Sequence, residues 1–323
     1  MLKELLRPDI WDPTMDPYSI PLDKIDMANS DIFMHGDAIF PLFERLRKED
    51  PVHYCAESCV EDVGAYWSIT KYHDIMSVDT NHKVFSSEGA ITLFDPQEDF
   101  TTPMFIAMDP PKHDIQRKAV NPVVAPSNLV NMEDLIRERT AEVLDSLPIN
   151  KEFNWVEDVS IELTTRMLAT LFDFPFEDRR KLTRWSDVST ARPGDGVVET
   201  EEQRKEELFE CLEYFTRLWN ERVNSEPKTD LISMLAHDPS TRDMEPMEYL
   251  GNLILLIVGG NDTTRNSMTG GILALNQNPE QYDKLRKDHS LIKTMVPEII
   301  RSVSYTHLRA HETRGNLVCR LLL

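Results

Sequence analysis

Residues 253–271 read Leu-Ile-Leu-Leu-Ile-Val-Gly-Gly-Asn-Asp-Thr-Thr-Arg-Asn-Ser-Met-Thr-Gly-Gly and place polar groups in the middle of an apolar, helix-like segment. The adjacent Gly259 and Gly260 each cost a helix interior about 1 kcal/mol relative to alanine. Thr263 follows Gly259 by one turn, so its hydroxyl can bind the Gly259 carbonyl and bend the helix open. We therefore expect a groove beside the Thr263 hydroxyl and the Asp262 carboxylate, suited to a small polar species held against a flat cofactor.

A second pattern lies upstream, at residues 108–118, Met-Asp-Pro-Pro-Lys-His-Asp-Ile-Gln-Arg-Lys. Pro110 and Pro111 stand where a helix can begin. His113 and Arg117 then lie one turn apart on one helix face. The two side chains can hold the same anion, and arginine binds carboxylates through paired hydrogen bonds. In isolation, however, such a pair is more often solvated surface.

A third pattern is Glu298-Ile-Ile-Arg301, which follows Val296 and Pro297. Glu298 and Arg301 share a helix face at this spacing. Such a pair contributes only a few tenths of a kcal/mol and has little weight by itself. Its position downstream of the glycine helix is what makes it informative.

Taken in order, the three patterns resemble those of the cytochromes P450. The glycine helix is similar to the family's Ala/Gly-Gly-x-Asp/Glu-Thr signature, and the His-x-x-x-Arg pair to its haem-propionate segment. The Glu-x-x-Arg pair is similar to the buried ion pair on the haem's proximal side. The resemblance implies a mostly α fold, a helical domain with a small β region, over residues 1–301. It also implies haem b, bound by His113 and Arg117 and against the two glycines, with Asp262 and Thr263 serving oxygen activation.

Longer phrases extend the resemblance to one branch, the bacterial alkane-hydroxylating CYP153 family. These include Val258–Ser267, the stretch at 108–118, Asp79-Thr-Asn-His-Lys-Val-Phe-Ser-Ser and Met295–Arg301. The branch implies hydroxylation of medium-chain alkanes or fatty acids, often at the terminal carbon. Molecular oxygen, a ferredoxin and a ferredoxin reductase would supply the oxidant and the electrons.

The likeness stops after Arg301. Residues 302–323 are basic and lack the character of the preceding chain, so we interpret them as a non-native, wrong-frame or adapter-like tail. A P450 would continue to the loop Phe-x-x-Gly-x-x-x-Cys-x-Gly, whose thiolate ligates the iron and favours O–O cleavage. We therefore expect the C-terminal part of the fold to be missing and this chain to be inactive. Cys319 lacks the flanking glycines and aromatic residue, so no metal ligand is assigned.

Composition excludes several other classes. The 323 residues carry 56 acidic against 35 basic side chains, a net charge of −21 that argues against nucleic acid as a partner. Lys112 and Lys118 flank the His-x-x-x-Arg pair; either they help Arg117 attract an acidic ferredoxin, or they are simply solvated. No signal peptide is visible and no apolar run reaches the roughly 18 residues of a membrane span, which predicts a cytoplasmic protein. Cys55, Cys59 and Cys211 are interpreted as reduced thiols.

The remaining pattern is mostly helical. Apolar residues recur at helical spacing over residues 37–49, 72–79, 127–146, 155–173 and 201–224, and Val52–Tyr54 and Tyr66–Thr70 are strand-like. The substrate pocket is expected to involve Leu93 and Phe94, in the loop of residues 85–103, together with Leu255 and Leu256. Residues 190–200 are expected to form a lid. An apolar pocket without a charged anchor suits a hydrocarbon or a fatty chain.

Two other classes stay open. The first is a non-catalytic, all-helical ligand-binding protein in which Asp262 and Thr263 only kink a helix. The second is a helical enzyme that uses metal-bound carboxylates, although no clustered Asp-rich motif is visible.

Overall fold

The computed structural model of the chain describes residues 15–29, 32, 39–60, 63–89, 91–93 and 99–302. Phe94, Cys319 and residues 303–323, which contain nearly all of the predicted non-native tail, lie outside the described residues. The described chain forms two compact units, a first unit over residues 15–93 and a second unit over residues 99–302. In the described part, no helix combines the length and the apolar character that crossing a membrane requires.

The first unit contains the small β region. Strands β1 (Val52–Cys55) and β2 (Tyr66–Ile69) pair antiparallel, with Val52 opposite Ile69 and Cys55 opposite Tyr66. Helix α3 (Ile39–Glu49) precedes the hairpin and α4 (Tyr72–Asp79) follows it, after the short 3-10 turns η1 (Pro17–Ser19) and η2 (Leu22–Lys24). The strands and α4 begin and end close to where the sequence pattern predicted them. The core of this unit is aliphatic and consists of Ile20, Ile25, Met27, Ile32, Ile39, Leu42 and Leu46.

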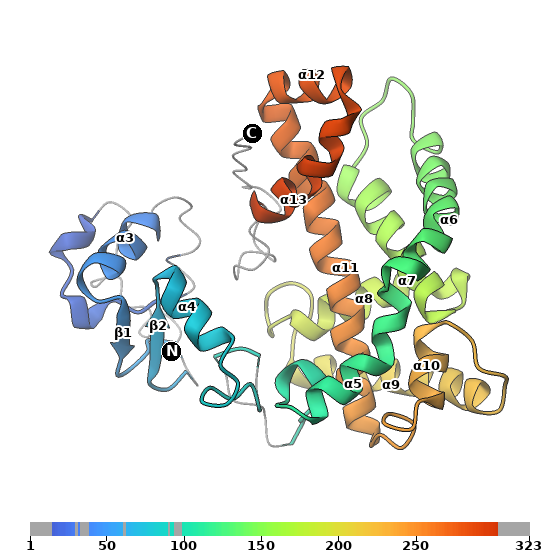
Figure 1. The fold of residues 1–323 in the computed structure, drawn as a ribbon, viewed down its shortest axis with the longest axis horizontal. Helices are drawn as coiled ribbons and strands as arrows, with labels where there is room; N and C mark the ends of the chain where they lie inside the picture. The colour runs from blue at the N-terminus through green and yellow to red at the C-terminus, as the bar shows by residue number, and fades with distance from the viewer. Residues whose placement is uncertain are drawn as a thin grey trace. The chain divides into compact units, whose positions relative to one another are not determined.

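The second unit consists mainly of helices in its described residues, and Figure 1 shows α11 running through it as its longest helix. Its elements in chain order are η4 (Phe105–Ala107), α5 (Lys112–Val120), η5 (Asn121–Val124), α6 (Pro126–Asp145), η6 (Val156–Ile161), α7 (Glu162–Phe172), η7 (Phe176–Asp178), α8 (Arg180–Thr190), α9 (Glu201–Val223), α10 (Leu231–His237), α11 (Pro246–Gln277), α12 (Pro279–Lys287), η8 (His289–Leu291) and α13 (Ile292–Ser302). Helix α11 contacts α7, α8, α9, α12 and α13.

The boundaries of α11 follow from its sequence. Pro246 occupies the first turn, where a missing N–H costs nothing, and the helix ends just before Asn278-Pro279. Its buried face carries Tyr249, Leu250, Leu253 and Ile257 at helical spacing. These side chains join the large core of the second unit, which also contains buried aromatic side chains from α7, α8 and α9 (Phe172, Trp185, Tyr214 and Phe215). The glycine helix of the sequence is therefore the central packing element of this unit.

One predicted helix is only partly α-helical. Residues 155–173 were expected to form a single α-helix, but η6 is a π-helical segment that leads into α7. Buried hydroxyls in this region reach α11: Ser160 Oγ lies 3.0 Å from Thr269 Oγ1, and Thr164 donates to Asn261 Oδ1 at 3.0 Å. The wider π turn changes the angular position of the residues that follow, and π segments are too rare for a sequence pattern to reveal them.

A dense ion-pair cluster joins α7 to the start of α8. Glu162 accepts hydrogen bonds from Arg166 at 2.6 Å, Arg179 at 2.8 Å and Arg180 at 2.7 Å. The guanidinium of Arg179 lies over the ring of Phe176, with 4.5 Å between the Arg179 Cζ atom and the ring centroid, which adds a cation–π contact. Burial alone would raise the pKa of Glu162, but the hydrogen bonds from Arg166 and Arg179 outweigh it and keep this pKa below its usual value of 4.5.

We predict that Glu162→Gln lowers the free energy of unfolding by about 2 kcal/mol at pH 7, because three arginines then lose their shared carboxylate. A carboxylate whose pKa is lower in the folded than in the unfolded state stabilises the fold fully at pH values above its unfolded pKa. This stabilisation disappears as the pH falls through its folded pKa. Urea unfolding should therefore show the largest difference between wild type and variant at pH 7 and a shrinking difference below about pH 4.5. A pH-independent difference would contradict the assignment.

Candidate functional site

The predicted hydroxyl contact on α11 is present. Thr263 Oγ1 donates to the Gly259 carbonyl at 2.8 Å, and the Thr263 side chain is half-buried. The expected opening of the helix is not seen, because residues 246–277 form one uninterrupted α-helix. A carbonyl oxygen has two lone pairs, so it can accept the hydroxyl and keep its place in the helical ladder.

The helix glycines differ sharply in what surrounds them. A methyl group built on Gly259 would meet no atom of the described chain within 4 Å, whereas on Gly260 it would lie 2.6 Å from Leu168 Cδ2. Gly251 and Gly271 are equally crowded, the first by Pro103 O at 2.2 Å and the second by a side chain of α13. Consecutive residues project about 100° apart on a helix, so only Gly259 presents bare backbone to open space. This surface can accept a flat group in close contact, while Gly260 serves the packing of α7.

Asp262 faces away from that surface. Its side chain is 10 % exposed, and Oδ1 accepts hydrogen bonds from Ser186 Oγ at 3.1 Å and from Arg265 Nη2 at 2.9 Å. Arg265 also pairs with Asp187 of α8 at 3.1 Å. The groove flanked by both the carboxylate and the Thr263 hydroxyl stays a prediction, although the hydrogen bonds of Asp262 go to Ser186 and Arg265 and not to Thr263. Instead, a polar path links α11 to partly exposed Asp187.

Helix α5 begins at Lys112, directly after Pro111, as the sequence predicted. His113 Nδ1 lies 2.7 Å from the Phe105 carbonyl oxygen, and because a carbonyl can only accept, this nitrogen carries the proton. Arg117, one turn later, is exposed. Neither the Arg117 guanidinium nor His113 Nε2 has a partner among the described residues. The guanidinium is thus available to an anion, and Nε2 is open to a further ligand.

The lysines beside this pair have different surroundings. Lys112 Nζ forms an ion pair with Glu248 of α11 at 2.9 Å, which ties α5 to α11. Lys118 is exposed and has no partner among the described residues. Lys112 is 56 % exposed within this ion pair, so it is largely solvated and partly neutralised, and a role in docking stays a prediction.

The third predicted pair forms on α13. Arg301 Nε donates to Glu298 Oε2 at 2.8 Å, and the second guanidinium nitrogen bonds the other carboxylate oxygen. Glu298 is 13 % exposed but Arg301 is 61 % exposed, so the pair is buried on one side only. Ile299, between them, packs onto Gly271 and fixes α13 against α11.

The residues predicted for the substrate pocket are less well defined by the structure. Leu255 and Leu256 are partly buried and pack against the core of the second unit. Leu93, in the first unit, is 49 % exposed. The three described cysteines Cys55, Cys59 and Cys211 are free, which confirms their interpretation as thiols.

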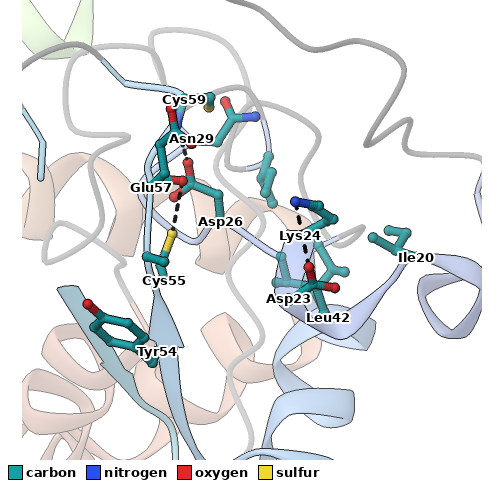
Figure 2. A pocket seen from close by; sticks show the side chains of 13 residues that line it. Ile20, Asp23, Lys24, Asp26, Asn29, Leu42, Tyr54, Cys55, Glu57 and Cys59 are labelled. Carbon is teal, nitrogen blue, oxygen red and sulfur yellow. Dashed lines mark hydrogen bonds and ion pairs between the residues drawn. The ribbon is translucent and has the colours of Figure 1, made fainter. Parts of the chain in front are cut away.

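A separate cavity of about 320 Å³ lies within the first unit and contains none of the predicted site residues (Figure 2). Asp26 stands at its wall, where it accepts hydrogen bonds from Tyr66 at 2.6 Å and from the Cys59 amide at 2.7 Å. Burial would raise the pKa of Asp26, but these bonds hold it below its usual value. Asp26 thus joins strand β2 to the turn that contains Cys59 through its hydrogen bonds. Among the described residues, no group of three or more His, Cys, Asp or Glu side chains could hold a metal ion.

Three residues that hold the site together were not predicted from the sequence: Ser186, Arg265 and Asn252. Asn252 is fully buried in α11 and accepts the Phe105 amide hydrogen at 2.9 Å. An asparagine just before the apolar run at 253–258 was a visible signal, since a buried amide needs hydrogen-bond partners. Ser186 could not be found this way, because only the tertiary packing of α8 brings it to Asp262.

Comparison with known proteins adds independent information. No family profile matches the chain. The solved structure of CYP153D17 from Sphingomonas sp. PAMC 26605 is 47 % identical, with a TM-score of 0.76, over 87 % of this chain and 70 % of that one. Cytochrome P450-153 from Novosphingobium aromaticivorans is 44 % identical, with a TM-score of 0.74, over 85 % and 69 % of the two chains. Linalool 8-monooxygenase from Pseudomonas putida is 29 % identical over 89 % of this chain and 73 % of its own length.

The two adjacent glycines give a matched test of the bare surface. We predict that Gly259→Ala raises the free energy of unfolding by up to about 1 kcal/mol, because alanine favours a helix and its methyl meets nothing. Gly260→Ala should give no such gain, because its methyl displaces Leu168. Urea unfolding without added cofactor measures both. A destabilising Gly259→Ala would mean that protein atoms cover this surface.

Proposed function

Since the chain belongs to the cytochrome P450 family, in its CYP153 branch, we propose that α5 and α11 hold the haem of an enzyme that hydroxylates medium-chain alkanes or fatty acids. Proteins of this family are haem b monooxygenases. The observation that carries the proposal is the combination of an uncovered backbone at Gly259 with an unpartnered imidazole nitrogen and guanidinium on α5. A flat, dianionic porphyrin needs both features.

Each residue has one task in this proposal. The Gly259 backbone lies against the macrocycle, and His113 Nε2 and Arg117 bind its carboxylates. Glu298 and Arg301 stabilise α13 itself through their paired hydrogen bonds, while Ile299 packs this helix onto α11. Gly260 contributes indirectly, since its missing side chain lets α7 pack closely against α11. Bound haem supplies the oxidising chemistry, which no side chain of this chain could perform.

Thr263 and Asp262 are proposed to manage protons. The Thr263 hydroxyl donates to the Gly259 carbonyl, so its oxygen lone pairs can accept a hydrogen bond from a small polar molecule beside the bare surface. Asp262 is anchored by Arg265, which in turn reaches Asp187 on α8. Exchange of the Arg265 partner between the two carboxylates would free Asp262 to accept or deliver a proton at Oδ1. The route would lead inward from the partly exposed Asp187.

Apolar side chains on α11 favour an apolar substrate, and exposed positive charge on α5 favours an acidic redox partner. Leu255 and Leu256 precede Thr263 by about two turns on α11, and we propose that they contact an alkyl chain. Relatives of this family receive electrons from redox partners, and we propose a ferredoxin with its reductase. With Lys112 partly neutralised by Glu248, Lys118 is the exposed positive charge next to the site that would attract an acidic partner.

We further propose that residues 1–323 alone do not catalyse hydroxylation, because no described cysteine suits the role of iron ligand. A ligating cysteine must lose its proton. Full burial raises the pKa of Cys211 well above its usual value, and burial followed by the charge of Asp26 raises that of Cys55. Cys59 lies with Cys55 at the cavity of the first unit. Cys319 is outside the described residues.

Haem titration tests the proposed site. The chain should bind haem in a stoichiometric complex with a Soret band, and Arg117→Ala should weaken binding about tenfold, because one carboxylate loses a charge-assisted partner. Arg137→Ala is the control, since Arg137 is 74 % exposed and pairs only with Glu133 one turn away on α6. Carbon monoxide should not produce the far-shifted band of thiolate-bound ferrous iron. Equal losses in both variants, or no haem uptake, would contradict the site, and a thiolate band would contradict inactivity.

Thr263 can be tested in an active background, a chimera of residues 1–301 with the C-terminal part of the Sphingomonas relative. Thr263→Ala should divert most of the reducing equivalents from hydroxylated product to peroxide, because the hydroxyl that holds the small polar molecule is lost. Thr263→Ser keeps the hydroxyl and should stay near the coupling of the unsubstituted chimera. Product and peroxide are measured per NADH consumed. Unchanged coupling in the alanine variant would remove Thr263 from the mechanism.

A further inference from the structure

We propose that Asn252 is a positioning residue: through the peptide group of Phe105, it sets the tautomer and the orientation of His113. This inference rests on the proposed function only in naming a haem carboxylate as the group that His113 meets. The Asn252 side chain touches neither the cofactor nor the reacting atoms, and its effect passes through a single backbone amide.

The hydrogen bonds form a continuous chain from α11 to α5. Asn252 Oδ1 accepts the Phe105 N–H at 2.9 Å, and the Phe105 carbonyl accepts His113 Nδ1–H at 2.7 Å. Asn252 is fully buried, and its amide nitrogen donates to the Glu248 carbonyl at 3.1 Å, which fixes the direction of the side chain. A buried backbone N–H that lost its acceptor would cost free energy, so the Phe105 peptide is held firmly in place.

A second observation supports the same arrangement. Gly251, the neighbour of Asn252, has the Pro103 carbonyl so close that a methyl group would overlap it at 2.2 Å, and Thr102 O would lie at 2.7 Å. The segment that leads into Phe105 therefore lies directly on the α11 backbone. Glycine permits the close approach, and Asn252 accepts the amide hydrogen of Phe105, two residues after Pro103.

The Phe105 carbonyl determines which ring nitrogen of His113 carries the proton. A histidine nitrogen that donates to a carbonyl must carry the proton, and this choice leaves Nε2 as the free nitrogen. Nε2 can then bind a carboxylate when the ring gains a second proton. Gln116, Glu248 and Lys112 hold α5 against α11 close by and thus share the framework, but they do not contact the Phe105 peptide.

The position of Asn252 also sets the register of the two parts of the site. Asn252 and Gly259 are seven residues apart on α11, so they share a helix face and lie about 10 Å apart along the axis. Anchoring the Phe105 peptide at Asn252 therefore fixes how far the His113 ring lies from the bare backbone against which the macrocycle would rest. A flat ligand that contacts both the Gly259 backbone and His113 would bind more weakly if either of them shifted.

Ring ¹⁵N NMR of the histidine-labelled chain tests the inference without any cofactor. At about pH 8.5, where ordinary histidines are neutral, His113 should be an Nδ1–H tautomer in the wild type. Asn252→Ala should shift it towards a mixture of tautomers, and Asn252→Asp, which keeps the acceptor for the Phe105 amide, should restore it. His237, whose ring binds backbone carbonyls on α10 and beyond, is the internal reference and should not change.

A wild-type His113 with the proton on Nε2 would overturn the inference, as would an unchanged tautomer in Asn252→Ala. If the alanine variant fails to fold, Asn252→Asp carries the test, because loss of the Nδ1–H tautomer despite the retained acceptor would overturn the inference.

Haem binding extends the test. Asn252→Ala should weaken haem binding about tenfold but leave the binding of haem dimethyl ester, which lacks the carboxylates, unchanged. In the His113→Ala background, Asn252→Ala should add no further loss; additive losses would overturn the inference. Failure of the wild type to bind haem would overturn the proposed function instead, and the tautomer would then decide the inference alone.

Discussion

Helix α11 has to be packed on most of its circumference and yet leave one strip of backbone uncovered. Glycines make both possible. Gly251, Gly260 and Gly271 admit the 102–105 segment, α7 and α13 at distances that no side chain would allow. A methyl group on Gly259 would meet no atom of the described residues within 4 Å. The helix loses intrinsic stability at each glycine and regains it through close contacts at Gly251, Gly260 and Gly271. Gly259 is the position that a cofactor can use.

Polar groups buried along the same helix hold its surroundings in place. Asn252 secures the loop before α5, Asn261 accepts a hydroxyl from α7, and Asp262 joins α8 through Ser186 and Arg265. Each of these groups would be costly to bury without its partner, so each specifies one arrangement of a neighbouring element. From within the core of the second unit, α11 thus holds the loop before α5, α7 and α8 in place.

The local features of the site could be read from the sequence because they depend on helical spacing. Thr263 bonds Gly259 one turn earlier, α5 starts after Pro111, and Glu298 pairs with Arg301. Helices α6 and α9 also begin and end within one residue of their predicted limits. In all of these cases the partners lie close together in the chain, where the geometry of a single helix decides the contact.

The features that escaped prediction involve partners far apart in the sequence. The pairing of Lys112 with Glu248, the direction of Asp262 and the anchoring of Phe105 by Asn252 depend on how α5 and α8 pack on α11. The π-helical segment before α7 escaped prediction for a different reason, because such segments are too rare for a sequence pattern to reveal them. A periodic pattern specifies which face of a helix is apolar, but it does not specify which polar group of another element that face will meet.

The account depends on one placement, a porphyrin that lies against Gly259 with its carboxylates at His113 and Arg117. A crystal structure of the chain soaked or co-crystallised with haem measures this directly. We expect the macrocycle plane to contact the Gly259 backbone and at least one carboxylate to lie within hydrogen-bond distance of Arg117. Haem bound elsewhere, for example in the cavity of the first unit, with Gly259 still facing solvent, would contradict the account.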